Sequence, residues 1–190
     1  MERILVASGN EKATAMLINL LKETFPACKA SIAATGLETR RAVGTGDYDC
    51  VVINCPLSDE YGNELAEIVS TSSNASCVVI AKSENADILA DKLEDFGVMV
   101  IPKPLSRQAF YRSMKFVSAS RKRMLGIQTE NLKLQKKLEE IRTINRAKFA
   151  LIQYLSFTEQ QAHRYLEKQA MDQRCTKFEV AQKVIKMYEV

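Results

Sequence analysis

One short segment near the C-terminus carries side chains suited to contact a polyanion. His163, Arg164, Lys168 and Arg174 lie within 163–174, and Arg164 and Lys168, four residues apart, share a face of the predicted helix. Cationic groups neutralise phosphates, while planar rings and guanidinium groups stack on exposed bases. The segment therefore has the chemistry of a nucleic-acid contact surface, although each side chain can also be read as an ordinary solvated residue.

The same part of the chain offers further residues with two readings. Lys148 and Lys177 would widen the basic surface, or they could serve only as solvated charges. Tyr165 and Leu166 could present apolar surface to a base, but their spacing favours a place in the helical core.

Residue types argue against catalysis and metal binding. One histidine cannot complete a Ser/His/Asp arrangement, and the sequence has neither a P-loop nor a Rossmann glycine pattern. The five cysteines form no CxxC pair, and three of them sit in apolar runs, where a thiol acts as a small hydrophobe. We expect a reduced, cytoplasmic protein without metal, cofactor or enzymatic activity. No apolar run approaches the roughly 20 residues of a transmembrane helix, so no membrane contact is expected.

Charge divides the chain into two parts. Residues 1–119 hold 12 Lys/Arg and 15 Asp/Glu, a net charge of −3, whereas residues 120–190 hold 15 and 8, a net charge of +7. This asymmetry suggests an acidic regulatory or docking module joined to a module that meets a polyanion.

Strand and helix signals alternate through residues 1–119. Apolar β-branched runs occur at 3–8, 49–55, 76–82 and 98–102, with a weaker one at 28–35, and amphipathic helices lie between them. We read "STSSNAS" (70–76) as a polar loop. Continuous apolar strands indicate a doubly wound, five-stranded parallel sheet covered on both faces, in which ligands meet the carboxyl ends of the strands.

At those strand ends, residues 1–119 resemble a response-regulator receiver domain. The resemblance rests on the strand order, "DCVVIN" (49–54), Gly62 and "PKPL" (102–105). It implies that Asn54 stands at the phospho-acceptor aspartate. The resemblance also implies that Ser8 and Gly9 stand where a receiver has its acidic pair, and that Ala81 stands where it has a Thr or Ser. Val100 would stand at the switch aromatic, and Lys103 at the lysine that partners the phosphoryl group.

These departures predict a pseudo-receiver domain. An amide is too poor a nucleophile for phosphoryl transfer, and magnesium needs carboxylate oxygens. Lys103 is either a relic ligand for another anion or, as we favour, a lysine kept for packing and solvation. Asp49 precedes its strand and Asp59 lies in the following loop, so neither replaces the nucleophile. A regulatory protein or ligand remains a possible partner of this domain.

A long helix is predicted from Ser106 to about Leu155, and part of it has heptad spacing. Met124, Asn131, Leu138 and Asn145 occupy one repeating position, and Ile127, Leu134 and Ile141 follow three residues later. We interpret 120–146 as a coiled-coil dimerisation helix. Asparagine at an a position favours a defined register, usually that of a parallel dimer. Packing of the helix within its own chain is the alternative.

Residues 147–190 predict an all-α three-helix module, because Thr158 with Gln161 and Thr176 with Glu179 each have capping-box spacing. Residues 125–188 resemble the ANTAR module, the RNA-binding output domain of AmiR/NasR-type antiterminators. The matching features are Leu155, Thr158–Glu159, Ala162–His163, Leu166, "QAMDQR" (169–174) and "FEVAQKVI". Family members often carry Tyr or Phe where His163 stands.

The resemblance implies a transcription antitermination regulator of the two-component type that binds leader stem-loops as a homodimer. Two other functions compete with this one: a DNA-binding regulator that uses the same basic helices, and a protein-interaction adaptor whose basic tail is incidental. Specific, salt-sensitive RNA binding would separate the first hypothesis from the other two.

Overall fold

A computed structural model describes residues 1–188 of the 190-residue chain. The fold divides into two compact units, residues 1–123 and residues 124–190. None of the helices within residues 1–188 combines the length and the hydropathy that a bilayer crossing requires.

The first unit is an alternating α/β domain. Its elements are β1 (Arg3–Ala7), α1 (Glu11–Thr24), β2 (Lys29–Ala33), α2 (Gly36–Thr45), β3 (Cys50–Asn54), α3 (Asn63–Ser72), β4 (Ser76–Lys82), α4 (Ser83–Leu93), the 3₁₀ turn η1 (Glu94–Phe96), β5 (Met99–Lys103) and the start of α5 (Arg107–Leu155). All strands pair in parallel, in the order β2-β1-β3-β4-β5. The predicted doubly wound, five-stranded sheet is therefore confirmed.

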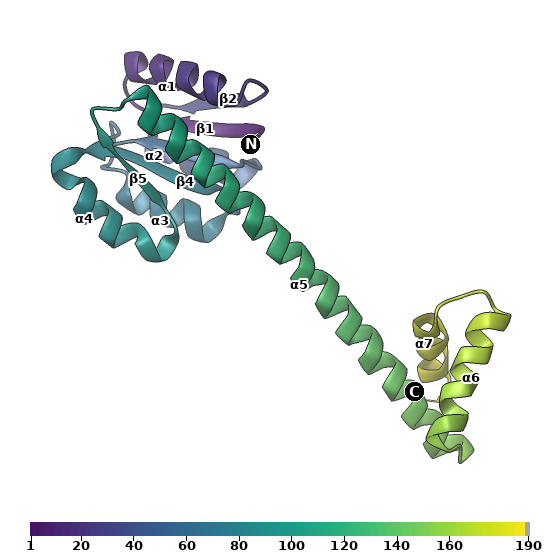
Figure 1. The fold of residues 1–190 in the computed structure, drawn as a ribbon. Helices are drawn as coiled ribbons and strands as arrows, with labels where there is room; N and C mark the ends of the chain where they lie inside the picture. The colour runs from purple at the N-terminus through teal and green to yellow at the C-terminus, as the bar shows by residue number, and fades with distance from the viewer. Residues whose placement is uncertain (189–190) are drawn as a thin grey trace. The chain divides into compact units, whose positions relative to one another are not determined.

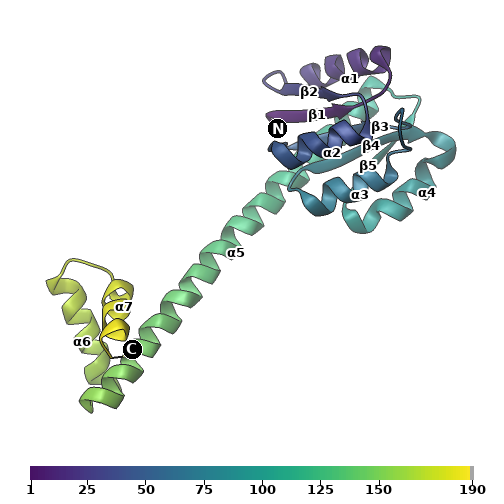
Figure 2. The same ribbon diagram turned by 180° about the vertical axis from the view of Figure 1, so that it is seen from behind.

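Helices cover both faces of this sheet, as Figures 1 and 2 show. Ile4 and Val6 of β1 pack with Leu17 of α1 and Phe110 of α5. The alternate strand residues pack on the other face, where α3 contributes Leu65. Successive side chains of a strand point to opposite faces, so strands buried on both sides must be apolar throughout. This explains why the apolar runs in the sequence located the strands.

The loop predicted at 70–76 is partly wrong, because α3 continues to Ser72. The hydroxyl groups of Thr71 and Ser72 donate to the carbonyl oxygens of Glu67 and Ile68, at 2.8 and 2.6 Å. Serine and threonine usually favour turns because they compete for backbone bonds. Here they bond back to the preceding helical turn and remain within the helix.

The second unit contains the remainder of α5, α6 (Glu159–Asp172) and α7 (Lys177–Tyr188). Its core combines small and branched side chains from all three helices, among them Ala147, Leu151, Leu166 and Val180. Alanine at these contacts lets the helix backbones approach closely. The long helix and the helical module predicted from the sequence are both confirmed.

Arg121 fixes α5 to the amino end of the sheet. Its guanidinium Nη2 donates to Asp49 Oδ1 at 3.1 Å, and Asp49 Oδ2 accepts from the backbone N–H groups of Glu2 and Arg3. Burial by itself raises the pKa of Asp49, but these N–H groups and Arg121 together hold the pKa below its ordinary value. The lowered pKa means that folding stabilises the ionised carboxylate.

We expect Arg121→Ala to destabilise the first unit by about 1 kcal/mol at neutral pH, a modest value because the pair is partly solvated. The stabilisation by ionised Asp49 is present above its unfolded pKa and disappears as pH falls through the lower folded pKa. Chemical denaturation at pH 7 and near pH 2 should therefore show a smaller difference from wild type at acid pH. Lys122→Ala, at a neighbouring exposed position, is the control. An equal loss in both variants would contradict the assignment.

Candidate functional site: a receiver-like strand edge and a basic helical module

The carboxyl ends of β1, β3, β4 and β5 lie at one edge of the sheet and carry the residues predicted for the pocket. Ser8 and Asn54 are brought together there, with 3% and 7% of their surfaces exposed. Asn54 Nδ2 donates to Ser8 Oγ at 3.1 Å. Two neutral groups thus satisfy each other across β1 and β3, where burial makes an unpaired polar group costly.

Lys103 lies at the same edge of the sheet and forms a hydrogen bond to the backbone. Its Nζ donates to the carbonyl oxygen of Cys55 at 2.6 Å, and burial lowers the pKa of this lysine. Burial also raises the pKa of the Cys55 thiol to about 11, so this thiol is protonated at neutral pH. Ala81 is fully buried and has no polar side-chain atom. Val100 is partly buried against the neighbouring core.

Both acids that the sequence offered as alternatives have structural roles. Asp59 accepts from the backbone N–H groups of Gly36 and Leu37 at the start of α2, at 2.8 and 3.1 Å, and these bonds lower its pKa. Asp49 is engaged at the opposite end of β3, as described above. Neither is positioned as a replacement for a carboxylate at Asn54.

Gly62 shapes the loop between β3 and α3. Its φ of 106° lies in the left-handed region, and a Cβ there would come within 2.8 Å of Cys55 Sγ. Both the backbone conformation and the lack of space require glycine at this position. The loop therefore keeps its close approach to the end of β3.

In the helical module, capping interactions fix where α6 and α7 begin. Thr158 and Gln161 form a reciprocal capping box, and the Thr176 backbone N–H donates to Glu179 Oε2 at 2.8 Å. Both predicted helix starts are confirmed. Leu166 is fully buried, as predicted for a core residue. Tyr165 is 36% exposed, and its ring packs against Phe157 in an edge-to-face arrangement.

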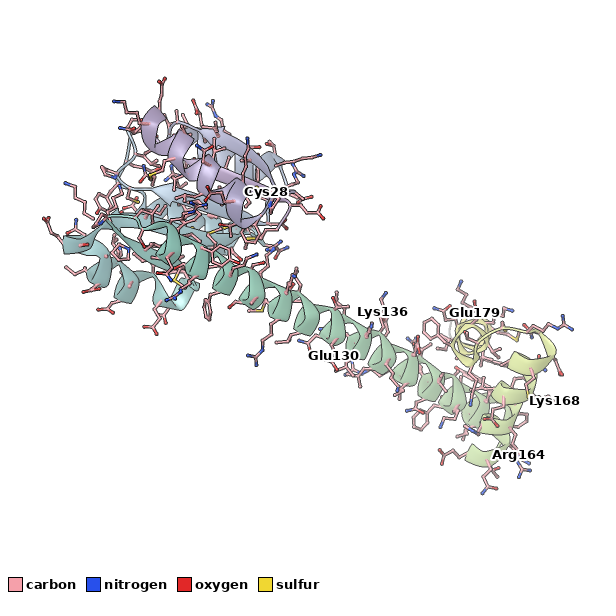
Figure 3. All side chains as sticks on the ribbon, turned by 45° about the horizontal axis from the view of Figure 1, so that its top comes forward. Cys28, Glu130, Lys136, Arg164, Lys168 and Glu179 are labelled. Atoms are coloured by element: carbon pink, nitrogen blue, oxygen red, sulfur yellow. The ribbon has the colours of Figure 1, made fainter. Side chains whose placement is uncertain are left out.

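The six basic candidates of this module fall into two groups. Arg164, Lys168 and Arg174 are exposed, and within residues 1–188 none of them forms an ion pair. Figure 3 shows the side chains of Arg164 and Lys168 extending outward from α6. Arg174 follows α6 with a φ of 50°, where the chain turns towards α7.

The other three candidates are engaged with carboxylates. His163 Nε2 and Lys177 Nζ lie 3.2 and 2.7 Å from Glu167 Oε1. The hydrogen bond and charge of Lys177, together with the charge of His163, lower the pKa of Glu167. Lys148 Nζ lies 3.3 Å from Glu159. These contacts reduce the positive charge around His163, Lys177 and Lys148. Arg164, Lys168 and Arg174, which have no such partner among the described residues, are therefore better placed to bind an anion.

Phe149 is an aromatic side chain outside the predicted contact residues, and it is 70% exposed. It lines a hollow of about 270 Å³ with Asn145, Lys148, Ile152 and Glu159. The structure places Ala147, Ala150 and Leu151 in the core, and Phe149, which lies between them in the sequence, falls on the exposed side of the helix. An exposed ring of this kind can stack on a base.

The predicted dimerisation residues are exposed within their own chain. The apolar members of the repeat (Met124, Ile127, Leu134, Leu138 and Ile141) are each 47–58% exposed, and Asn131 is exposed as well. All lie in the uninterrupted helix α5. They therefore form an apolar stripe that their own chain does not cover.

Residues 132–185, in the C-terminal part of the chain, match the ANTAR domain family. The chain carries an ANTAR domain. This confirms the resemblance predicted over 125–188. No curated protein matches the chain.

Solved structures show the fold of the unit that precedes the ANTAR domain. A receiver domain from Methanospirillum hungatei JF-1 has a TM-score of 0.56 at 19% identity, covering 65% of this chain and 98% of its own. A two-component response regulator from Clostridium difficile has a TM-score of 0.53 at 19% identity, covering 63% and 97%.

A streptococcal protein, described as one of a family of redox sensors evolved from two-component response regulators, has a TM-score of 0.53 at 21% identity. It covers 65% of this chain and 54% of its own. All three similarities concern the fold. The chain thus combines a receiver-like fold with a segment that matches the ANTAR domain family.

Proposed function

We propose that this chain is an RNA-binding transcription antitermination regulator that acts in the cytoplasm on stem-loops of nascent leader RNA. The observation that carries the proposal is the ANTAR domain at 132–185, whose α6 presents Arg164 and Lys168 without carboxylate partners among the described residues. Exposed cations can neutralise phosphates, while exposed planar groups stack on loop bases. Residues 147–190 form the proposed RNA-binding module, of which 189–190 lie outside the described residues.

Within this surface, the contacts suggest an order of importance. Arg164, Lys168 and Arg174 supply the main phosphate contacts, because no internal ion pair has to be broken first. His163, Lys148 and Lys177 contribute less, since Glu167 and Glu159 already occupy them. The match to the ANTAR family favours RNA over the DNA-binding alternative, and the free charge favours a nucleic acid over the adaptor alternative. No catalytic step is proposed.

Dimerisation forms the second part of the proposal. Segment 120–146 pairs with a second copy through Met124, Ile127, Asn131, Leu134, Leu138 and Ile141. Five of these side chains are apolar and about half exposed at heptad spacing, so pairing would bury them. Asn131 at an a position supports a parallel register, in which it meets the same residue of the second copy.

The third part concerns residues 1–119, which we propose to be a receiver that has lost its phosphorylation site. The buried Asn54–Ser8 bond stands where the reaction needs a nucleophile and metal-binding carboxylates, and Gly9 supplies none. Regulation would then come from a protein or ligand bound to this domain. The streptococcal redox sensor is one example of a receiver fold in another sensory role.

RNA binding can be tested with the triple variant Arg164→Ala, Lys168→Ala and Arg174→Ala. Crosslinking to RNA in native cells should recover leader stem-loops with wild type and lose them with this variant. With a recovered RNA, affinity should fall about a hundredfold and the salt slope should drop by about three, because three phosphate contacts are lost.

The matched control for this test is Lys12→Ala, Arg41→Ala and Arg112→Ala, which removes the same charge from exposed positions of the first unit. If both triple variants recover the same RNA as wild type, specific binding at this surface is refuted.

Pairing can be tested with two leucines of α5 that have similar exposure, 54% for Leu134 and 59% for Leu132. Leu134 occupies a d position, whereas Leu132 is off the repeat. We expect Leu134→Ala to weaken the dimer at least tenfold, because two seam side chains are truncated per pair. Leu132→Ala should leave the dissociation constant unchanged in analytical ultracentrifugation. Equal effects would mean that the heptad repeat does not define the contact.

The loss of phosphorylation can be tested by incubating the protein with acetyl phosphate and Mg²⁺ and measuring its intact mass. We expect no added phosphoryl group in wild type and none in Asn54→Asp, because Ser8 and Gly9 supply no metal-binding carboxylate. A Mg²⁺-dependent gain of one phosphoryl group in wild type that disappears in Asn54→Ala would overturn this part of the proposal.

A further inference from the structure

The charged residues beside the proposed seam of α5 have an unusual arrangement. The a positions of the heptad repeat are Met124, Asn131 and Leu138. Glu130 and Lys137 then fall at g positions, and Gln135 and Arg142 fall at e positions. All lie in one unbroken helix. In a parallel pair, each g residue faces the e residue five positions later on the other copy. These flanking positions therefore decide whether charge supports or opposes pairing.

Three such contacts follow from this register. Arg123 meets Gln128 and Glu130 meets Gln135, so neither contact joins opposite charges. The third places Lys137 beside Arg142 of the second copy. Two-fold symmetry repeats this like-charge contact on the other side of the pair. The seam thus has two repulsive contacts and no attractive contact at these positions to offset them.

The chain's own carboxylates do not neutralise these cations. Glu140 lies three residues after Lys137, and Glu139 lies three residues before Arg142. Both spacings are close enough for ion pairs along a helix. Nevertheless, in the described part of the chain neither Lys137 nor Arg142 forms an ion pair, and both side chains are exposed. Their charges remain available to a ligand.

We propose that Lys137 of one copy and Arg142 of the second copy form a phosphate-binding site that exists only in the dimer. The inference rests on the proposed function, because it requires both pairing and an RNA ligand. A backbone phosphate between the two cations accepts hydrogen bonds from both and replaces their repulsion by attraction. Lysine at g and arginine at e fit this role, since both carry several donors.

The consequence is a coupling between RNA binding and pairing. If phosphate stabilises the dimer, the dimer must bind phosphate more tightly than the monomer, by the same factor. Without a polyanion the seam is weakened by its two like-charge contacts and by the polar Asn131 layer. The dimer therefore assembles most completely on RNA.

Neighbouring lysines of α5 provide a matched test. Lys136 is at the f position, on the outer side of the paired helices, and Figure 3 shows this residue midway along α5. Lys137→Glu and Lys136→Glu change the net charge equally, but only Lys137→Glu creates an attractive pair with Arg142 across the seam. The full-length variants should be compared by sedimentation velocity, with inorganic polyphosphate as the probe.

We expect polyphosphate to tighten the wild-type dimer about tenfold relative to sodium chloride of equal ionic strength. Lys137→Glu should form a dimer about tenfold tighter than wild type without polyphosphate and should gain nothing from the probe. Lys136→Glu should behave as wild type in both conditions. Equal shifts in the two variants, or a weaker dimer in Lys137→Glu, would overturn the inference.

Its failure can be distinguished from failure of the proposed function. If wild type dimerises and Leu134→Ala does not, but both glutamate variants behave alike, pairing stands and only the phosphate site is wrong. If wild type is monomeric with and without polyphosphate, the dimer itself is refuted, and this site with it. Loss of specific RNA recovery in cells, with polyphosphate coupling intact, would refute antitermination alone.

Discussion

The organisation of the chain depends on the helix α5 and on how it distributes its apolar side chains. Early in the helix, Phe110 and Met114 are fully buried against the sheet. Near its end, Ala147 and Leu151 are fully buried against α6 and α7. Between these segments, apolar residues recur at heptad positions but remain about half exposed. One helix therefore completes two separate cores, and its central part has apolar surface that its own chain does not cover.

At the carboxyl edge of the sheet, the buried polar side chains of Asn54 and Ser8 are neutral and hydrogen-bond to each other. Carboxylates crowded at one edge repel each other and normally require a metal ion to balance them. Asn54 and Ser8 avoid that requirement because they hydrogen-bond to each other, and Lys103 bonds to the Cys55 carbonyl oxygen. These two hydrogen bonds pair polar groups at the carboxyl ends of β1, β3 and β5.

Much of the fold could be predicted from the sequence because burial on both faces makes the strands apolar, and the heptad and capping patterns mark the helices. The end of α3 could not, since Thr71 and Ser72 are typical loop residues until their hydroxyl groups find helical carbonyl oxygens. The candidate site was predicted by residue type but not by contact. Nothing in the spacing shows that Lys177 reaches Glu167 on a different helix, ten residues away. The exposure of Phe149 likewise became visible only when its neighbours were found in the core.

Free and paired charges are unevenly distributed over the basic module. A uniformly free set of lysines and arginines would bind any polyanion, with an affinity set mainly by charge and salt. Here Glu167 and Glu159 reduce the positive potential around His163, Lys177 and Lys148, while Arg164 and Lys168 retain theirs. The positive potential is thereby concentrated on a smaller part of α6. For the RNA contact proposed above, phosphates that reach this part of α6 are therefore expected to contribute most to binding.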